Sequence, residues 1–405
     1  MQTNLAAFIR DTADGREAEA ILRSCVHCGF CNATCPTYQI LGDELDGPRG
    51  RIYLIKQMLE GQPVTARTRR HLDRCLTCRN CETTCPSGVR YGRLIDIGRQ
   101  LVDHLAPRPV MERLLRAGLR RALATRAVFQ PLLTLGQGVR GLLPSTLRAH
   151  IPTPLSAGVR PDTTHPRRML VLEGCVQPGL APETNAAAAR VLDRLGIQLI
   201  AAPEAGCCGA IDQHLGDADM ARSAMRRNID AWWPHIQAGA EAIVMTASGC
   251  GSLVKEYGHL LRDDPVYAAK AAQISELTED LGEVLAREDL TQLRPGKPRR
   301  IVFHSPCSLQ HGQKLHGVIE SILAGLGHEL LPVGEAHLCC GSAGTYALLQ
   351  PELSGQLRER KLSNLLARGP ELIATANIGC QSHLAAKSTV PVVHWISLLE
   401  GESSS

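Results

Sequence analysis

The chain has 405 residues and a formal net charge of +4, with 44% hydrophobic but only 3% aromatic residues. This length predicts two or three domains with aliphatic cores. The small net charge and the scarcity of aromatic side chains exclude a strongly basic nucleic-acid-binding protein. The outlier is cysteine, with 16 residues in a protein too large to need disulfides for its stability. We therefore expect metal or redox chemistry.

The N-terminal segment mixes acidic and apolar residues and lacks the basic start and apolar run of a signal peptide. No stretch approaches the roughly 18 apolar residues of a membrane-spanning helix. We therefore expect neither a signal peptide nor a transmembrane helix.

The cysteines form two sets of eight, and each set is an internal repeat. The first set recurs at an offset of 50 residues, and the second recurs at offsets of 132, 132 and 130 residues. Matched offsets of this kind indicate two copies of one unit in each half of the chain.

Residues 1–107 show helical periodicity, with helices expected near 52–59 and 94–105. Two motifs in this region read CVHCGFCNATCP and CLTCRNCETTCP, the C-x2-C-x2-C-x3-C-P pattern of bacterial [4Fe–4S] proteins. A single C-x2-C also occurs in zinc sites, and cysteines also form disulfides, but two complete motifs favour clusters. The spacing between Cys35 and Cys75 leaves room for a helix after each motif, so we expect an α-helical ferredoxin.

The spacing within each motif predicts crossed ligand sets. Three cysteines lie close enough along the chain to bind one cluster, whereas the fourth, followed by proline, binds the other cluster. Crossing brings the two clusters close together, which suits electron transfer between them. Cluster 1 is expected to be bound by Cys25, Cys28, Cys31 and Cys85, and cluster 2 by Cys75, Cys78, Cys81 and Cys35.

Residues 108–167 begin as a basic amphipathic segment and end as a proline-containing linker. Between residues 110 and 150 the segment carries seven arginines and one acidic residue, interleaved with leucines. Such a face packs on a neighbouring domain, binds a partner subunit or lies on an anionic membrane surface.

From residue 168 onward, short apolar runs alternate with amphipathic stretches, which predicts α/β units with mostly parallel sheets. We expect a first unit over 168–293 and a second over 299–402, joined by a Pro- and Gly-containing seam at 294–300. The expected strands are 169–172, 198–201, 243–245, 301–303, 330–333, 372–374 and 390–393, and the expected helices include 183–195, 218–237, 266–285 and 353–366.

Each α/β unit carries a single cysteine, then Cys-Cys-Gly, then another single cysteine, and each follows a predicted strand. Because the carboxyl ends of parallel strands share one edge of a sheet, four thiols can converge there. Buried unreactive cysteine is the alternative, but it does not explain matched positions in both units. A dithiol site also stays open, although vicinal disulfides are strained. The candidate ligands for a further iron–sulfur cluster or zinc are Cys175, Cys207, Cys208, Cys250, Cys307, Cys339, Cys340 and Cys380.

Several long strings, among them CVHCGFCNATCPTYQILGDELDGPRGRIYLIKQ, EAGCCGA, TASGCGSLVKEYG and LCCGSAGTYAL, resemble the family of iron–sulfur subunits of bacterial glycolate oxidases. Its relatives include the C subunit of anaerobic glycerol-3-phosphate dehydrogenase and lactate-utilisation iron–sulfur proteins. The resemblance implies that the eight ferredoxin cysteines are cluster ligands and that this chain holds no catalytic residue.

The same resemblance implies FAD-containing partner subunits that oxidise glycolate to glyoxylate, with D-lactate as a second substrate. This chain would pass electrons to a respiratory-chain acceptor such as a quinone. It would lie peripherally on the cytoplasmic side of the inner membrane, and no nucleic acid is expected as a partner.

The second half also resembles the heterodisulfide reductase B subunit, whose CCG repeats hold noncubane [4Fe–4S] clusters. Those repeats end in C-x-x-C, whereas here Leu253 and His383 occupy the last position. The chain departs from that pattern, and His383 is either a substitute ligand or an ordinary helix residue. Two alternatives to the glycolate assignment are the equivalent subunit of a glycerol-3-phosphate or lactate dehydrogenase complex, and a thiol/disulfide reductase of heterodisulfide reductase type.

Overall fold

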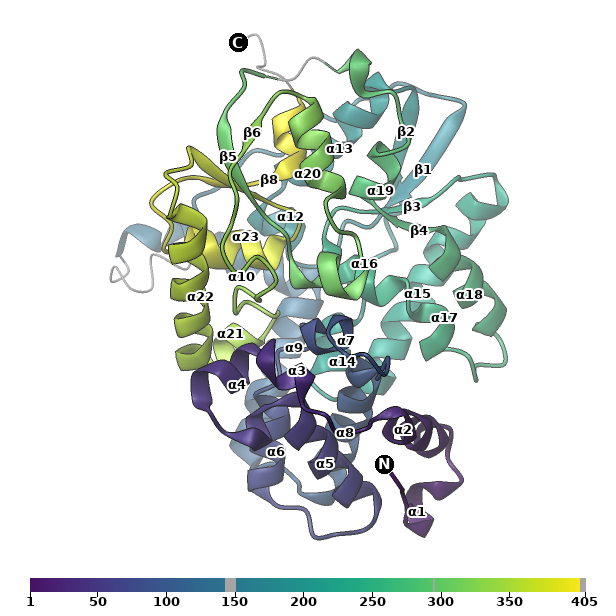
Figure 1. Cartoon of the computed structure of the whole chain (residues 1–405). Helices are drawn as coiled ribbons and strands as arrows, with labels where there is room; N and C mark the ends of the chain where they lie inside the picture. The colour runs from purple at the N-terminus through teal and green to yellow at the C-terminus, as the bar shows by residue number, and fades with distance from the viewer. Residues whose placement is uncertain (143–150, 294–295, 401–405) are drawn as a thin grey trace.

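The computed structural model describes residues 1–142, 151–293 and 296–400. Part of the basic segment (143–150), part of the expected seam (294–295) and the end of the expected second unit (401–402) lie outside the described residues. Figure 1 shows a helical N-terminal region at one end of the molecule and two sheets with their covering helices at the other.

The N-terminal region is helical, as the periodicity predicts. Two of its longer helices pack together, because Ile55 and Met58 of one and Leu94 and Ile95 of the other belong to a shared aliphatic core. The helices are α1 (Ala7–Arg10), α2 (Ala13–Ser24), α3 (Phe30–Ala33), α4 (Pro36–Leu41), η1 (Glu44–Asp46), α5 (Pro48–Leu59), α6 (Ala66–Asp73), α7 (Asn80–Thr83) and α8 (Tyr91–Leu105).

The basic segment forms two helices, α9 (Val110–Ala124) and α10 (Arg126–Gly138), followed by η2 (Arg140–Leu142). Arginines on one side of α9 pair with acidic residues of neighbouring elements. Arg116 lies 3.3 Å from Asp73, and Arg120 lies 3.2 Å from Asp217 of the first α/β unit. Part of the basic face therefore packs against both neighbouring regions.

The rest of the chain forms two four-stranded sheets with the orders β2-β1-β3-β4 and β6-β5-β7-β8, in which every pairing is parallel. The expected α/β repeat with parallel sheets is confirmed. The strands are β1 (Arg167–Val171), β2 (Ile197–Ala201), β3 (Ile243–Met245), β4 (Thr278–Asp280), β5 (Arg300–His304), β6 (Glu329–Leu330), β7 (Leu372–Thr375) and β8 (Val392–His394).

One sequence expectation was wrong: residues 266–285 do not form a single helix. The stretch contains α18 (Ala268–Leu277), then β4, then α19 (Leu281–Leu285). Asp280 ends the strand and caps α19 in a capping box with Glu283, so the helical pattern breaks and begins again there. The strand β4 reads Thr-Glu-Asp, so it lacks the apolar run by which the other strands were recognised.

Further helices cover the sheets, and one aliphatic core joins the two units. Met169 and Val244 of the first sheet belong to the same buried cluster as Ile301 and Leu372 of the second. The helices are α12 (Gln177–Leu180), α13 (Glu183–Arg194), α14 (Ala210–His214), α15 (Ala218–Gln237), α16 (Ser248–Val254), α17 (Tyr257–Leu260), η3 (Leu290–Gln292), η4 (Ser308–Gly312), α20 (Val318–Gly325), α21 (Tyr346–Leu349), α22 (Pro351–Leu366), α23 (Ile378–Ala385) and η5 (Trp395–Leu399).

The junction between the two units contains a buried carboxyl group. Asp280 is 1% exposed, accepts a hydrogen bond from the Gly282 N–H at 3.0 Å and one from Gln313 of the second unit at 3.3 Å. Burial raises the pKa of Asp280 to about 7, with the neighbouring Glu283 adding to the effect and Lys255 opposing it. The folded state therefore holds a proton here that the unfolded chain has released.

This raised pKa predicts a pH-dependent loss of stability. Below about pH 4 both states are protonated, and between about pH 4 and 7 only the unfolded chain ionises, so stability falls as pH rises. We expect Asp280→Asn to remove this loss, which amounts to at most about 4 kcal/mol.

The measurement is the melting temperature of Asp280→Asn and of the unsubstituted chain from pH 4 to 8. Asp263→Asn, at a side chain that is 73% exposed, is the control and should leave the profile unchanged. Parallel profiles for Asp280→Asn and the unsubstituted chain would contradict the assignment.

Candidate functional site: two ferredoxin pockets and two CCG repeats

The two ferredoxin loops share one backbone conformation despite different sequences. Each begins directly after a helix and places two residues in the left-handed region, His27 and Gly29 in the first loop and Thr77 and Arg79 in the second. A non-glycine residue in this region is disfavoured by about 1–2 kcal/mol. The matched angles therefore indicate that both loops must curl in the same way to direct their sulfur atoms inward.

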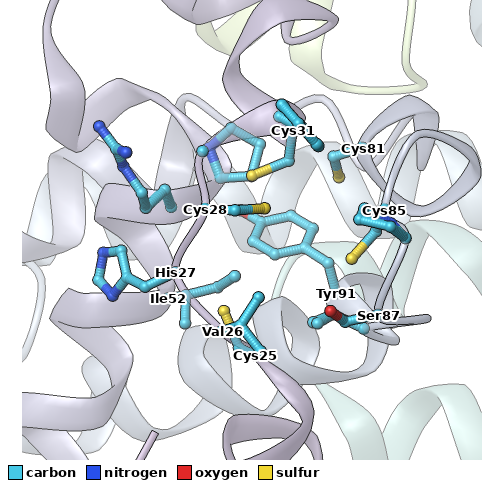
Figure 2. Close-up of a pocket in the computed structure, with 16 residues that line it drawn as sticks. Cys25, Val26, His27, Cys28, Cys31, Ile52, Cys81, Cys85, Ser87 and Tyr91 are labelled. Atoms are coloured by element: carbon cyan, nitrogen blue, oxygen red, sulfur yellow. The ribbon is translucent and has the colours of Figure 1, made fainter.

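The first pocket gathers one complete predicted ligand set. Cys25, Cys28, Cys31 and Cys85 all line it. Figure 2 shows their sulfur atoms arranged around the ring of Tyr91 in this view. Burial raises the pKa of Cys31 to about 11, and the neighbouring sulfurs of the other three add to this shift.

The second pocket gathers the other predicted set. Cys35, Cys75, Cys78 and Cys81 line it together with Arg51 and Tyr91. Burial also raises the pKa of Cys81, and its neighbouring sulfurs are those of Cys78, Cys75 and Cys35. Because Cys81 and Tyr91 line both pockets, the two sites share a wall.

The donor set fits iron–sulfur clusters. Each pocket offers at least four thiols in a largely apolar surrounding, with Cys81 lining both, and a thiol is deprotonated when it coordinates a metal. Hydrogen bonds to sulfur are already in place: the Thr77 N–H donates to Cys75 Sγ at 3.4 Å, and the Tyr91 hydroxyl donates to the same atom at 3.6 Å. Hydrogen bonds to the ligand sulfurs alter the reduction potential of a bound cluster.

A buried cation offsets negative charge at the second pocket. Arg51 is 1% exposed and donates to Thr37 Oγ1 and to the His71 carbonyl oxygen. Burial opposes its charge, but Tyr91, Cys75, Cys35 and Asp46 together raise its pKa. Its position is held in turn by Asp46, whose buried carboxylate also pairs with Arg74 at 2.7 Å.

In the first CCG repeat the four candidate cysteines come together at the carboxyl ends of the strands. Cys175, Cys207, Cys208 and Cys250 form a continuous chain of sulfur contacts in that order. Hydrogen bonds from Cys175 and Cys208 lower the pKa of Cys207, and the Gly209 N–H donates to its sulfur at 3.4 Å. One sulfur at the centre of the group is therefore favoured as a thiolate.

The second CCG repeat has the same arrangement. Cys307 Sγ lies 3.8 Å from Cys339 Sγ, and the chain of contacts continues through Cys340 to Cys380. The Gly341 N–H donates to Cys339 Sγ at 3.4 Å. Gly341 has a φ of 91°, and a Cβ there would lie 2.7 Å from the Ser354 carbonyl oxygen, so only glycine fits after the cysteine pair.

Sequence reasoning missed two features of the second repeat. The first is its contact with the ferredoxin region: Cys78 and Leu76 pack in one cluster with Cys307 and Cys339. The second is His304 at the end of β5, which lies beside Cys340 and Cys380. No sequence signal marks the contact, because the partners lie more than 200 residues apart.

His383, the candidate substitute ligand, bonds instead to a neighbouring helix. Its Nε2 lies 3.3 Å from the Ser354 hydroxyl oxygen of α22. It is not part of the close group that contains His304.

Known families match both halves of the chain. The 4Fe-4S dicluster domain matches residues 21–89, and the cysteine-rich domain matches residues 169–255 and 301–385.

Three relatives span different shares of the chain. The glycolate oxidase iron-sulfur subunit of Escherichia coli (strain K12) is 58% identical over 401 residues, 99% of this chain and 98% of that protein. A probable glycolate oxidase iron-sulfur subunit of Bacillus subtilis (strain 168) is 30% identical over 90% of this chain and 88% of its own length. Lactate utilization protein A of Exiguobacterium sp. is 26% identical over 53% of this chain and 86% of its own length.

Proposed function

The chain belongs to the family of glycolate oxidase iron–sulfur subunits, and from this we propose that it is the electron-transfer subunit of a glycolate-oxidising complex. The observation that carries the proposal is the pair of adjoining four-cysteine pockets with a shared wall. FAD-containing partner subunits oxidise glycolate to glyoxylate, with D-lactate as a second substrate. This chain passes the electrons to a respiratory-chain acceptor such as a quinone.

We propose two [4Fe–4S] clusters with crossed ligands: Cys25, Cys28, Cys31 and Cys85 for cluster 1, and Cys75, Cys78, Cys81 and Cys35 for cluster 2. The pocket linings and the sulfur neighbours of Cys31 and Cys81 support this division. A bound cluster supplies one-electron redox chemistry. The chain's own contribution is to hold the thiols, to donate hydrogen bonds to Cys75 and to place Arg51 beside the second set.

We propose the domain division 1–107, 108–167, 168–293 and 299–402. The four-thiol groups of the CCG repeats are candidate sites for a further iron–sulfur cluster or zinc, which their sulfur-to-sulfur contacts support. The thiol/disulfide reductase alternative is weaker, because Leu253 and His383 replace the last cysteine of each repeat. The lactate alternative rests on lower identity over about half of the chain.

We also propose peripheral association with the cytoplasmic side of the inner membrane. Among residues 1–142, 151–293 and 296–400, no helix combines the length and apolarity needed to cross a bilayer. The outer side of α9 and α10 instead exposes an apolar surface with arginines nearby, a combination that suits an anionic lipid surface. This outer apolar surface consists of Val110, Met111, Leu114, Leu115, Leu132 and Leu135, each more than half exposed.

The electron-transfer role is tested in the complex assembled with its flavoprotein subunits. In Cys78→Ser we expect glycolate still to reduce the flavin, because that step belongs to the partners, and quinone reduction to fall to background. Stopped-flow absorbance follows the flavin, and copurification of the partners controls for assembly. Faster flavin reduction by glycerol 3-phosphate than by glycolate would favour the alternative complex, and unchanged quinone reduction would overturn the role.

The crossed assignment predicts which substitutions behave alike. We expect each of Cys28→Ser and Cys85→Ser to remove the same cluster and lower iron from about eight to about four per chain. Cys78→Ser and Cys35→Ser should remove the other cluster. The measurement is iron content together with the electron paramagnetic resonance spectrum of the reduced protein, and identical spectra for Cys28→Ser and Cys35→Ser would contradict the crossing.

The membrane proposal predicts that charge on the outer apolar surface weakens lipid binding. We expect Leu114→Glu combined with Leu115→Glu to reduce binding to phosphatidylglycerol vesicles by about tenfold, through lost apolar contact and added repulsion. Cosedimentation measures the binding. Leu348→Glu, at an exposed leucine of α21 outside this surface, is the control. Equal binding by the two variants would show that the surface serves another purpose, such as contact with a partner subunit.

A further inference from the structure

The second CCG repeat brings a histidine to its cysteines. His304, Cys340 and Cys380 are all buried, and their ligand atoms lie within 4.8 Å of one another. They come from the end of β5, from the Cys-Cys-Gly turn and from α23. Three elements distant in the sequence therefore direct metal-binding atoms to one point.

The hydrogen bonds of His304 define which ring nitrogen is available. The Thr375 hydroxyl donates its single proton to the His304 carbonyl oxygen at 3.1 Å, so its oxygen must accept from Nδ1–H, 3.1 Å away. Nδ1 therefore carries the ring proton, and Nε2 carries a lone pair. Nε2 is fully buried and has no hydrogen-bond partner, and the whole residue is 2% exposed. A buried acceptor without a partner is destabilising unless a ligand fills the position.

The close spacing favours a single ion over a cluster. Zinc binds sulfur at about 2.3 Å and nitrogen at about 2.0–2.1 Å, so ligand atoms around one ion lie within a few ångströms of one another. A cubane spreads its ligands over four irons. Among the described residues only two groups of three metal-binding side chains come this close, and neither contains a ferredoxin cysteine.

The other close group is already neutralised. It consists of Asp43, Asp46 and His71, and Arg51 and Arg74 pair with the Asp46 carboxylate. Beside the His304 group, the Lys361 ammonium donates hydrogen bonds to the carbonyl oxygens of Glu335 and Ala336 and pairs with no carboxylate of the group.

We propose that the second CCG repeat binds one zinc ion through His304 Nε2, Cys340, Cys380 and Cys339. Cys339 lies outside the close group, but its sulfur contacts that of Cys340, so a small shift toward the ion would make it the fourth ligand. Binding releases three thiol protons and leaves a net charge of −1 on the site. Lys361, which is 2% exposed, lies close enough to Cys339 and Cys340 to offset that charge.

The first repeat provides an internal comparison. At the offset of 132 residues the position of His304 is occupied by Leu172, a buried residue with no ligand atom. The zinc site is therefore specific to the second repeat, although both repeats keep four cysteines. Zinc has no redox chemistry of its own. The site would stabilise the surface on which Cys78 and Leu76 pack. The presence or absence of zinc there leaves the electron-transfer proposal unaffected.

The test is elemental analysis of the full chain, purified with its partner subunits after growth with zinc and iron. We expect about one zinc per chain, and almost none in His304→Leu or Cys380→Ser, with iron unchanged. His304→Leu installs the residue that the first repeat has, and His316→Leu, at an exposed histidine of the same repeat, is the matched control that should keep its zinc. X-ray absorption at the zinc edge should report three sulfurs and one nitrogen.

Three results would overturn the site. They are the absence of zinc in the unsubstituted chain, retention of zinc in His304→Leu, or loss of iron in that variant, which would identify an iron–sulfur cluster instead. If His304→Leu does not fold, Thr375→Val decides. It removes the bond that orients the imidazole and should weaken zinc binding by about 10–100-fold in competition with a chelator. Unchanged affinity in Thr375→Val would exclude His304 as a ligand.

Discussion

The burial of thiols close to one another is the constraint on which the rest of this structure depends. A buried sulfur resists ionisation, as the raised pKa values of Cys31 and Cys81 show, yet a thiolate is the form that binds metal. Hydrogen bonds from the neighbouring backbone favour the thiolate form of some of these buried sulfurs. Backbone N–H groups point at Cys75, Cys207 and Cys339, each donated by the residue two positions further along. The turns that supply these donors also hold the sulfurs in position.

Each half of the chain contains two copies of one structural unit. The two copies carry different residues at positions where their structural surroundings differ. Gly29 and Arg79 occupy matching positions and adopt the same left-handed conformation. Glycine has no side chain, whereas the Arg79 guanidinium pairs with Glu256 of the first CCG repeat. Leu172 and His304 differ in the same way: one fills an apolar core and the other brings a ligand atom. Departures from repeat symmetry therefore locate functions that the shared motif does not encode.

Much of the fold follows from local pattern. The cysteine spacing predicted both ferredoxin loops, and the apolar runs predicted seven of the eight described strands to within a few residues. The eighth, β4, was missed because a buried aspartate both ends it and restarts a helix. His304 was missed for another reason: a histidine in a strand is usually a core residue, and its significance depends on partners 36 and 76 residues away. Only tertiary structure brings such groups together.

The ferredoxin region contacts the first CCG repeat through ion pairs and the second through a contact with an apolar centre. It meets the first repeat through ion pairs, such as Glu17 with Arg262 and Arg79 with Glu256. It meets the second through an apolar, sulfur-containing cluster around Cys78 and Cys339, with hydrogen bonds beside it such as that from the Asn80 amide to the His337 carbonyl oxygen. Partly exposed ion pairs add little stability and mainly fix orientation, whereas apolar contact excludes water. The first repeat therefore orients the ferredoxin region, and the second provides the dry contact beside the second cysteine pocket. A rigid, water-excluding contact at this position keeps the surroundings of Cys78 constant, and constant surroundings are what a fixed reduction potential requires.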